Sequence, residues 1–264
     1  MPYVTTPSVR LFYVRRPSRQ PESPSVLFIH GAGGNALLWG RVLNRLPSAD
    51  CIALDLPGHG RSSGPACSSI QAHSAAVLEL ATALGLHDLV VVGHSMGGAV
   101  ALQVALSEPS RVRALVLLST SARLFVAPAL LEQLAADPAQ AREWIVEAGY
   151  GPETPAQTRL VGARQLAQVP PEVLHGDFMA CSNVDYRNRL VEVRCPALVL
   201  CGSEDRLTPP RYVRALQEGL PAARFELIPR TGHMLPLECP EAVAEAIARF
   251  LDSPVCSIRR GPPA

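Results

Sequence analysis

The chain has 264 residues, of which 48% are hydrophobic and 18% are charged, and its formal net charge is +1 at pH 7. This length and apolar content suffice for one large α/β domain, or for one domain with an insertion. The near-zero charge and the scattered arginines argue against nucleic acid or an anionic membrane as a partner. No apolar run could span a bilayer and the first residues show no signal-peptide pattern, so we expect a cytoplasmic protein without membrane insertion.

The cysteines and histidines show neither a disulfide nor a metal-binding pattern. The seven cysteines are odd in number and form no C-x-x-C pair, so we expect reduced thiols. The seven histidines have no H-E-x-x-H or comparable ligand spacing. The sequence therefore predicts no metal and no cofactor, and it carries no signal for an oligomeric state.

Strands and helices alternate in the first part of the chain. Residues 9–14 alternate imperfectly between apolar and polar and predict a first strand, paired with residues near Tyr3. Short apolar runs predict strands buried on both faces at residues 26–29, 51–54, 89–92 and 114–118. Helical sequence lies between them at residues 37–46, 69–84 and 99–106.

A glycine-rich loop, His30-Gly31-Ala32-Gly33-Gly34-Asn35, follows the strand at residues 26–29. Glycines let the backbone approach a substrate, and such a loop can direct a backbone N–H at a developing oxyanion. A phosphate-binding loop is the alternative, but neither G-K-[ST] nor G-x-G-x-x-G is present. We therefore expect the N–H of Ala32 to be an oxyanion-hole donor.

A second loop, after the strand at residues 51–54, contains His59. A catalytic role for this histidine is one interpretation. We favour the other, in which His59 is held by backbone contacts of its own loop.

The apolar run at residues 89–92 leads directly into Gly93-His94-Ser95-Met96-Gly97 and then into helical sequence that stops at Pro109. A strand, a serine between two glycines and a helix are typical of a nucleophile elbow, in which the serine adopts a strained conformation. The alternative is a glycine-rich connection in which Ser95 caps the helix. We expect Ser95 to be a nucleophile and the N–H of Met96 to be the second oxyanion-hole donor.

The alternation of strands and helices stops between residues 121 and 187. Apolar residues recur there at mostly helical spacing, interrupted by prolines, and predict about four short helices. Because the insertion leaves and re-enters at strand ends, we favour a cap over the site rather than extra packing on a sheet face. We divide the chain into a core (residues 1–120 and 188–252), a helical cap (121–187) and a flexible tail (253–264).

An acidic residue follows the next predicted strand, at residues 197–201. In the loop Gly202-Ser203-Glu204-Asp205, Asp205 can orient and stabilise a histidine. Thr208 and Pro209 already supply the first positions of the following helix, so Asp205 is not needed as a cap. Glu204 is the competing acid.

A histidine follows the last predicted strand, at residues 224–228. His233 lies in a loop after Gly232 and before a helix predicted at residues 240–251, and it is the natural general base. The order of Ser95, Asp205 and His233 along the chain is that of α/β-hydrolases and not that of the two serine-protease classes.

Together these segments resemble the α/β-hydrolase superfamily, in its small capped esterase/lactonase branch, over nearly the whole chain. The resemblance implies an α/β-hydrolase fold, with a mostly parallel central sheet flanked by helices and a helical cap insertion. It also implies Ser95 as nucleophile, His233 as base and Asp205 as acid. Ala32 and Met96 would supply the oxyanion hole. A serine nucleophile argues against the epoxide hydrolases and haloalkane dehalogenases of this fold, which use aspartate.

We therefore expect a serine hydrolase that cleaves a carboxylic ester, lactone or thioester of a small, partly apolar substrate through an acyl-enzyme. Three alternatives stay open: a carbon–carbon bond hydrolase, a lyase or synthase with the same triad, and a ligand-binding receptor with vestigial hydrolysis. The sequence of the cap does not distinguish them.

Overall fold

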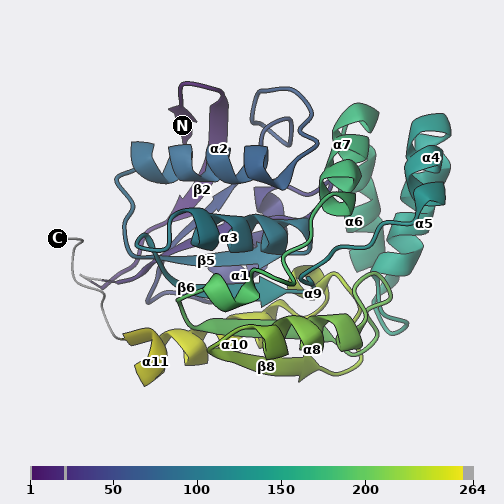
Figure 1. The fold of residues 1–264 in the computed structure, drawn as a ribbon. Helices are drawn as coiled ribbons and strands as arrows, with labels where there is room; N and C mark the ends of the chain where they lie inside the picture. The colour runs from purple at the N-terminus through teal and green to yellow at the C-terminus, as the bar shows by residue number, and fades with distance from the viewer. Residues whose placement is uncertain (1, 21–22, 258–264) are drawn as a thin grey trace.

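A single sheet of eight strands, in the order β1-β2-β4-β3-β5-β6-β7-β8, forms the centre of the computed structural model, which describes residues 2–20 and 23–257 (Figure 1). The pairs β1–β2 and β2–β4 are antiparallel, and the pairs from β4 through β8 are parallel. The strands are β1 (Tyr3–Thr5), β2 (Arg10–Arg16), β3 (Ser25–Ile29), β4 (Asp50–Leu54), β5 (Leu89–His94), β6 (Val112–Leu118), β7 (Ala197–Gly202) and β8 (Ala223–Ile228).

The helices of the core lie on both faces of this sheet, in two separate apolar clusters. One cluster packs α2, α3 and α8 on the sheet, and the other packs η1, α1, α9, α10 and α11 on the opposite face. The core helices are η1 (Ala36–Trp39), α1 (Gly40–Leu43), α2 (Ile70–Ala83), α3 (Met96–Ser107), η2 (Leu190–Glu192), α8 (Pro210–Gly219), α9 (Leu235–Glu238), α10 (Pro240–Leu251) and α11 (Pro254–Ser257). Strand β5 is buried at every position, as its valine-rich sequence predicts.

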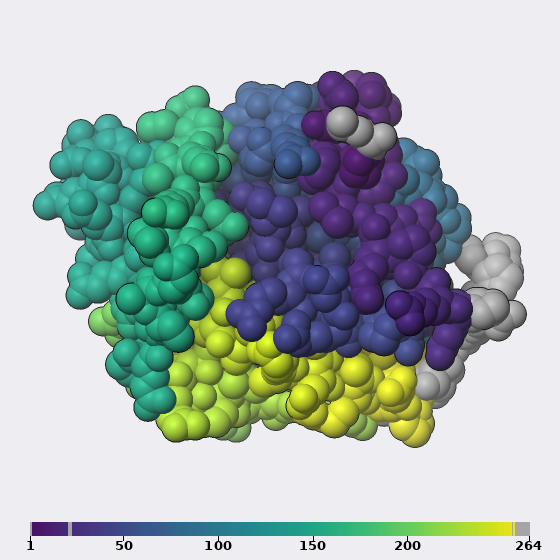
Figure 2. Space-filling view, turned by 180° about the vertical axis from the view of Figure 1, so that it is seen from behind, coloured from purple at the N-terminus to yellow at the C-terminus, as the bar shows by residue number. Residues whose placement is uncertain are grey.

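Four further helices lie between β6 and β7 and form the helical cap insertion, seen beside the sheet in Figure 1 and as a teal-to-green lobe in Figure 2. They are α4 (Pro128–Ala136), α5 (Pro138–Gly149), α6 (Ala156–Ala167) and α7 (Pro171–Ser182). Their own apolar cluster is centred on Leu134, Leu166 and Leu174. The chain leaves and re-enters at one place, where Tyr186 N–H donates to the carbonyl of Ala122 at 2.7 Å.

The predicted fold class is confirmed, and the structure differs from the sequence prediction in three local details. The helix predicted at residues 37–46 is a 3₁₀ turn followed by the single turn α1, with Gly40, a poor helix former, at the junction. Helix α8 begins at Pro210, so Thr208 is not its cap. Residues 254–257, predicted as part of a flexible tail, form α11, and Cys256 packs into the core. Residues 258–264 lie outside the described residues.

None of the helices in the described part of the chain is both long enough and apolar enough to cross a membrane. Among the described residues, none of the cysteines at positions 51, 67, 181, 195, 201, 239 and 256 is joined to another by a disulfide. The cytoplasmic location stays a prediction.

Candidate active site

Ser95 lies at the sharp turn between β5 and α3, with backbone angles φ 54° and ψ −119°. This left-handed conformation is costly for a residue with a side chain and occurs where the surrounding structure enforces it. The Ser95 side chain makes no capping hydrogen bond to α3, so the alternative role as a helix cap is not observed. Between residues 89 and 102, Ser95 is the one position that is not buried.

Two glycines make this turn sterically feasible. A Cβ atom on Gly93 would overlap the backbone of Gly97, and one on Gly97 would overlap the carbonyls of Ile29 and His30 at the end of β3. The elbow therefore needs glycine on both sides of Ser95, because the backbones of β3, β5 and α3 meet there.

The loop after β3 is held by His30, which is fully buried. Nδ1 of His30 donates to the carbonyl of Gly31 at 2.8 Å, and Nε2 accepts from the N–H of Leu56 at 3.0 Å. Burial, followed by the charge of His59, lowers the pKa of His30 to about 3, which keeps the ring neutral. The Gly31 carbonyl also accepts from Gly34 N–H at 3.0 Å. Because a trans peptide directs its N–H opposite to its carbonyl, these bonds fix the direction of the Ala32 N–H.

His233 and Asp205 are brought together from the loops after β8 and β7. Nδ1 of His233 lies 2.9 Å from Oδ2 and 3.1 Å from Oδ1 of Asp205. Burial alone would raise the pKa of Asp205, but the charge and hydrogen bond of His233, with bonds from Thr208, outweigh it and leave this pKa below its ordinary value. An ionised Asp205 fixes the proton of His233 on Nδ1 and leaves Nε2 to accept one.

Thr208 completes the surroundings of this carboxylate. Its hydroxyl donates to Oδ2 of Asp205 at 2.7 Å, and its N–H donates to Oδ1 at 2.8 Å. This use of the hydroxyl explains why Thr208 does not cap α8. The competing acid, Glu204, is exposed and accepts from the hydroxyl of its neighbour Ser203 at 3.1 Å, so the acid that faces His233 is Asp205.

His94, the last residue of β5, holds the backbone of His233. Its Nε2 donates to the backbone carbonyl of His233 at 2.9 Å, and the two ring centroids are 4.9 Å apart. Burial, followed by the charge of His233, lowers the pKa of His94 to about 3, so the ring is neutral at physiological pH.

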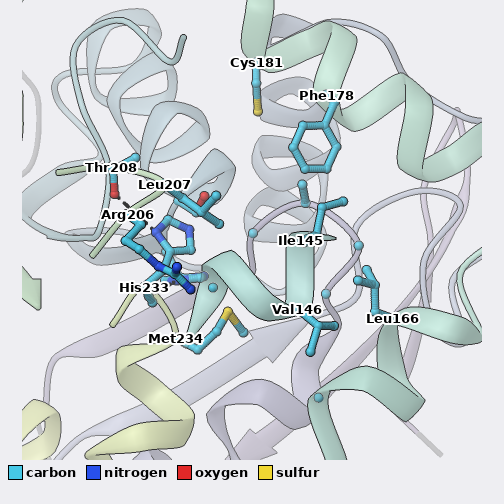
Figure 3. A pocket seen from close by; sticks show the side chains of 18 of the residues that line it. Ile145, Val146, Leu166, Phe178, Cys181, Arg206, Leu207, Thr208, His233 and Met234 are labelled. Atoms are coloured by element: carbon cyan, nitrogen blue, oxygen red, sulfur yellow. Dashed lines mark hydrogen bonds between the residues drawn. The ribbon is translucent and has the colours of Figure 1, made fainter. Parts of the chain in front are cut away.

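Ser95, His233 and Ala32 line one cavity of about 290 Å³ between the sheet edge and the insertion. The opposite wall is apolar and comes from the four helices and the segment before them; in Figure 3, Phe178 and Leu166 lie across the cavity from His233. Met96 begins α3, so its N–H is one of the first-turn donors that have no partner inside the helix. The structure therefore brings all five residues predicted for the site to one end of the sheet.

Sequence reasoning missed two carboxylates that bind the loops of the site. Asp177, on α7, accepts from the N–H of Gly33 at 2.8 Å. Glu238, on α9, accepts from the N–H groups of Gly232 at 3.1 Å and Met234 at 3.0 Å. Asp177 could have been found from its position in the sequence, because it is an acidic residue on the same side of a predicted helix as the apolar Leu174 and Phe178. We find no comparable signal for Glu238.

The fold, the elbow and the His–Asp pair define an α/β-fold serine hydrolase. A sequence model of the Alpha/beta hydrolase family matches residues 26–246, and the chain belongs to that family. Among curated proteins, it is 32% identical over 244 residues to the pimeloyl-[acyl-carrier protein] methyl ester esterase of Salmonella typhimurium, covering 86% of this chain and 94% of that protein.

Solved structures give the same class. A thermophilic esterase from Thermogutta terrifontis, 25% identical, superposes with a TM-score of 0.85 over 94% of this chain and 97% of its own. An N-acyl homoserine lactone degrading enzyme, also 25% identical, has a TM-score of 0.84 over 94% of this chain and 100% of its own.

Proposed function

We propose that this protein hydrolyses a carboxylic ester or lactone of a small, partly apolar substrate through an acyl-enzyme. Ser95 is the nucleophile, His233 the general base and Asp205 the acid that orients it. The observation that carries the proposal is the strained Ser95, which shares a cavity with a histidine whose Nδ1 is bound to a buried carboxylate. The relatives support this reading, because one is named a methyl ester esterase and another is described as degrading a lactone.

In this mechanism His233 Nε2 accepts the proton of the Ser95 hydroxyl while the oxygen of Ser95 attacks the ester carbonyl. The carbonyl oxygen becomes an oxyanion that the N–H groups of Ala32 and Met96 stabilise, and losing one such donor typically costs about 3–4 kcal/mol. His233 then gives its proton to the leaving alcohol. A water molecule, deprotonated by His233, attacks the acyl-enzyme and releases the acid.

The cavity indicates what kind of substrate fits. Its volume of about 290 Å³ is at the lower end of the range for ligand pockets, roughly 300–1,000 Å³. Its lining is largely apolar, and the larger apolar side chains are Leu38, Leu124, Phe125, Val126, Leu130, Trp144, Ile145, Val146, Leu166, Phe178, Leu207 and Met234. We infer a substrate with a short or medium apolar chain beside the ester group, shielded from water by the cap.

The test is hydrolysis of p-nitrophenyl esters of increasing acyl length by the wild type and by Ser95→Ala. Ser107→Ala is the matched control, because Ser107 ends the same helix but lies away from the cavity. We expect turnover that depends on Ser95 and a preferred chain length that reports the size of the pocket. Hydrolysis that survives in Ser95→Ala contradicts the assignment of the nucleophile.

The alternatives give different results in a second assay. A fluorophosphonate that labels Ser95 stoichiometrically, with no turnover of any ester or lactone, contradicts ester hydrolysis and favours a lyase or a receptor. Cleavage of an activated carbon–carbon substrate in place of esters favours a carbon–carbon bond hydrolase.

A further inference from the structure

A second buried histidine–aspartate pair lies on the other side of the oxyanion loop. Asp177 is fully buried, and its Oδ2 lies 2.8 Å from Nε2 of His59. Its other oxygen, Oδ1, is 3.5 Å from Nε2 of His73, which is also fully buried. Among the described residues, no cluster of three or more His, Cys, Asp or Glu is placed to hold a metal ion, so these groups need another explanation.

His59 is doubly protonated in this arrangement. Its Nδ1 faces the carbonyl of Pro57 at 3.0 Å, and its Nε2 faces the carboxylate of Asp177. Both partners only accept hydrogen bonds, so both ring nitrogens must donate. Burial opposes the charge on His59, but the negative charge and the hydrogen bond of Asp177 outweigh burial and raise the pKa of His59. The structure thus contains an ion pair that is excluded from water.

A buried ion pair is a poor source of stability, because desolvation of the two charges offsets much of their attraction. Such a pair can nevertheless fix geometry. The same oxygen of Asp177 that binds His59 also accepts from the N–H of Gly33 at 2.8 Å, immediately after Ala32. His59 belongs to the core and Asp177 to the insertion. Through Asp177, the pair therefore connects the core and the insertion at the peptide between Ala32 and Gly33.

Packing leaves Gly33 little other freedom. Gly33 has φ +63°, and a Cβ atom there would lie 2.6 Å from a methyl of Leu166 and 2.8 Å from a methyl of Leu174. The loop is therefore confined by two helices of the insertion and hydrogen-bonded to one of them. His30 fixes the peptide before Ala32, and Asp177 fixes the peptide after it.

We propose that Asp177, held by its ion pair with His59, is a positioning residue for the oxyanion hole. It keeps the Ala32 N–H directed at the reacting carbonyl, and it makes the cap insertion part of the catalytic apparatus. The proposal rests on the proposed function for the role of Ala32, but its geometry is independent of which ester is the substrate.

The test compares Asp177→Ala and Asp177→Asn with Leu134→Ala. Leu134 is buried in the apolar cluster of the insertion and does not line the cavity, so its truncation destabilises the insertion without removing a hydrogen bond to the oxyanion loop. Two reactions are followed: hydrolysis of the preferred p-nitrophenyl ester, which gives kcat and KM, and phosphonylation of Ser95 by a fluorophosphonate, which gives a rate of labelling. In phosphonylation the Ser95 oxygen displaces fluoride from phosphorus, while the P=O oxygen occupies the oxyanion hole.

We expect Asp177→Ala to lower kcat and the phosphonylation rate about 10- to 100-fold with little change in KM, since misplacing one oxyanion donor affects the transition state and not ground-state binding. Asp177→Asn, which keeps an oxygen for Gly33 but lacks the charge for His59, is expected to lie between Asp177→Ala and the wild type. If Asp177→Ala does not fold, Asp177→Asn alone is compared with the wild type. Leu134→Ala should keep both rates near those of the wild type.

Phosphonylation rates in both Asp177 variants that equal the rate in Leu134→Ala would overturn the positioning role. Failure of the wild type to hydrolyse any ester or lactone would instead overturn the proposed function. The phosphonylation rates would still decide the role of Asp177, because that reaction needs only Ser95, its base and the oxyanion hole.

Discussion

Glu238 holds the backbone on both sides of His233. Its Oε2 accepts from Gly232 N–H at 3.1 Å, and its Oε1 accepts from Met234 N–H at 3.0 Å. The same carboxylate accepts from Gly151 N–H at 2.9 Å in the insertion. His233 itself donates its N–H to the carbonyl of Gly149 at 2.9 Å. The proposed base is therefore held by hydrogen bonds shared between the core and the cap.

Replacing Glu238 should affect stability and rate together. In Glu238→Gln the amide NH₂ takes the place of one accepting oxygen, so a partly buried N–H loses its partner, which costs about 1–3 kcal/mol at most. We expect that loss in urea unfolding and a kcat about tenfold lower, because the base is displaced slightly. Glu241→Gln is the control, since the ion pairs of Glu241 with Arg41 and Arg45 lie at the surface. Equal behaviour of the two variants would contradict the role of Glu238.

Asp205→Asn should cut kcat by roughly 10³–10⁴-fold, because an amide no longer fixes the proton of His233 on Nδ1. The protein should fold, since Asn retains the size of Asp205 and one acceptor for Thr208. Glu204→Gln serves as the control and should turn over at nearly the wild-type rate, because Glu204 is exposed and bonded to Ser203. A larger loss in Glu204→Gln would show that the wrong acid is assigned.

Ser95→Gly should be more stable than Ser95→Ala by about 1 kcal/mol. Glycine relieves left-handed strain of about 1–3 kcal/mol at φ 54°, and this exceeds the extra backbone entropy that glycine loses on folding, about 0.5–1 kcal/mol. Both variants should lack activity. Urea midpoints for the two variants measure the difference, and a less stable Ser95→Gly would mean that the turn carries no strain.

Stability should fall on the acid side of neutrality because of two neutral histidines. Burial lowers the pKa of both His30 and His94 to about 3, whereas an unfolded histidine titrates near about 6.5. Between these values the unfolded chain binds more protons, so the free energy of unfolding decreases as pH falls from about 6.5 toward about 3. His94→Gln should flatten this part of the profile in urea unfolding at stepped pH. An unchanged slope would contradict a neutral His94.

Stability should also fall on the alkaline side because of His59. Its raised pKa means that the folded protein holds this proton above pH 6.5, where the unfolded chain has lost it, so the ion pair stabilises below that pH and is lost as pH rises. Asp177, His30, His73 and Asp55 are the titratable groups around it. Asp177 stays ionised, because its pKa is lowered to about 2. Asp177→Asn should remove the alkaline decline; a decline that persists would place its cause elsewhere.

Local sequence predicted most of the fold and the principal site. The apolar runs around Val91 and Val199 predict parallel strands buried on both faces, and both are buried throughout. The glycines on either side of Ser95 lie so close to neighbouring backbone that a Cβ atom would overlap it. Asp205 and His233 follow strands, and parallel strands bring their carboxyl ends to one edge. Each of these signals depends on a few neighbouring residues.

The supporting residues could not be predicted in this way. Asp177 and Gly33 are 144 positions apart, and their contact depends on how α7 packs over the loop. The use of the Thr208 hydroxyl depends on the distance to Asp205 and not on helix-capping preference, which is why α8 begins later than its sequence suggested. Contacts of this kind depend on tertiary packing and have no periodic pattern in the chain.

The two ends of the insertion leave the sheet side by side, with Tyr186 bonded to Ala122 and a β-bridge between Arg123 and Asp185. A segment with such closely spaced ends can be exchanged for one of another length without moving β6 or β7. Chimaeras that carry a foreign cap at this junction should therefore fold readily. On the proposal above, their turnover would depend on whether the foreign cap supplies a carboxylate that accepts from the N–H of Gly33, as Asp177 does. The exchange of substrate specificity between relatives would then be limited by this one carboxylate rather than by the shape of the pocket.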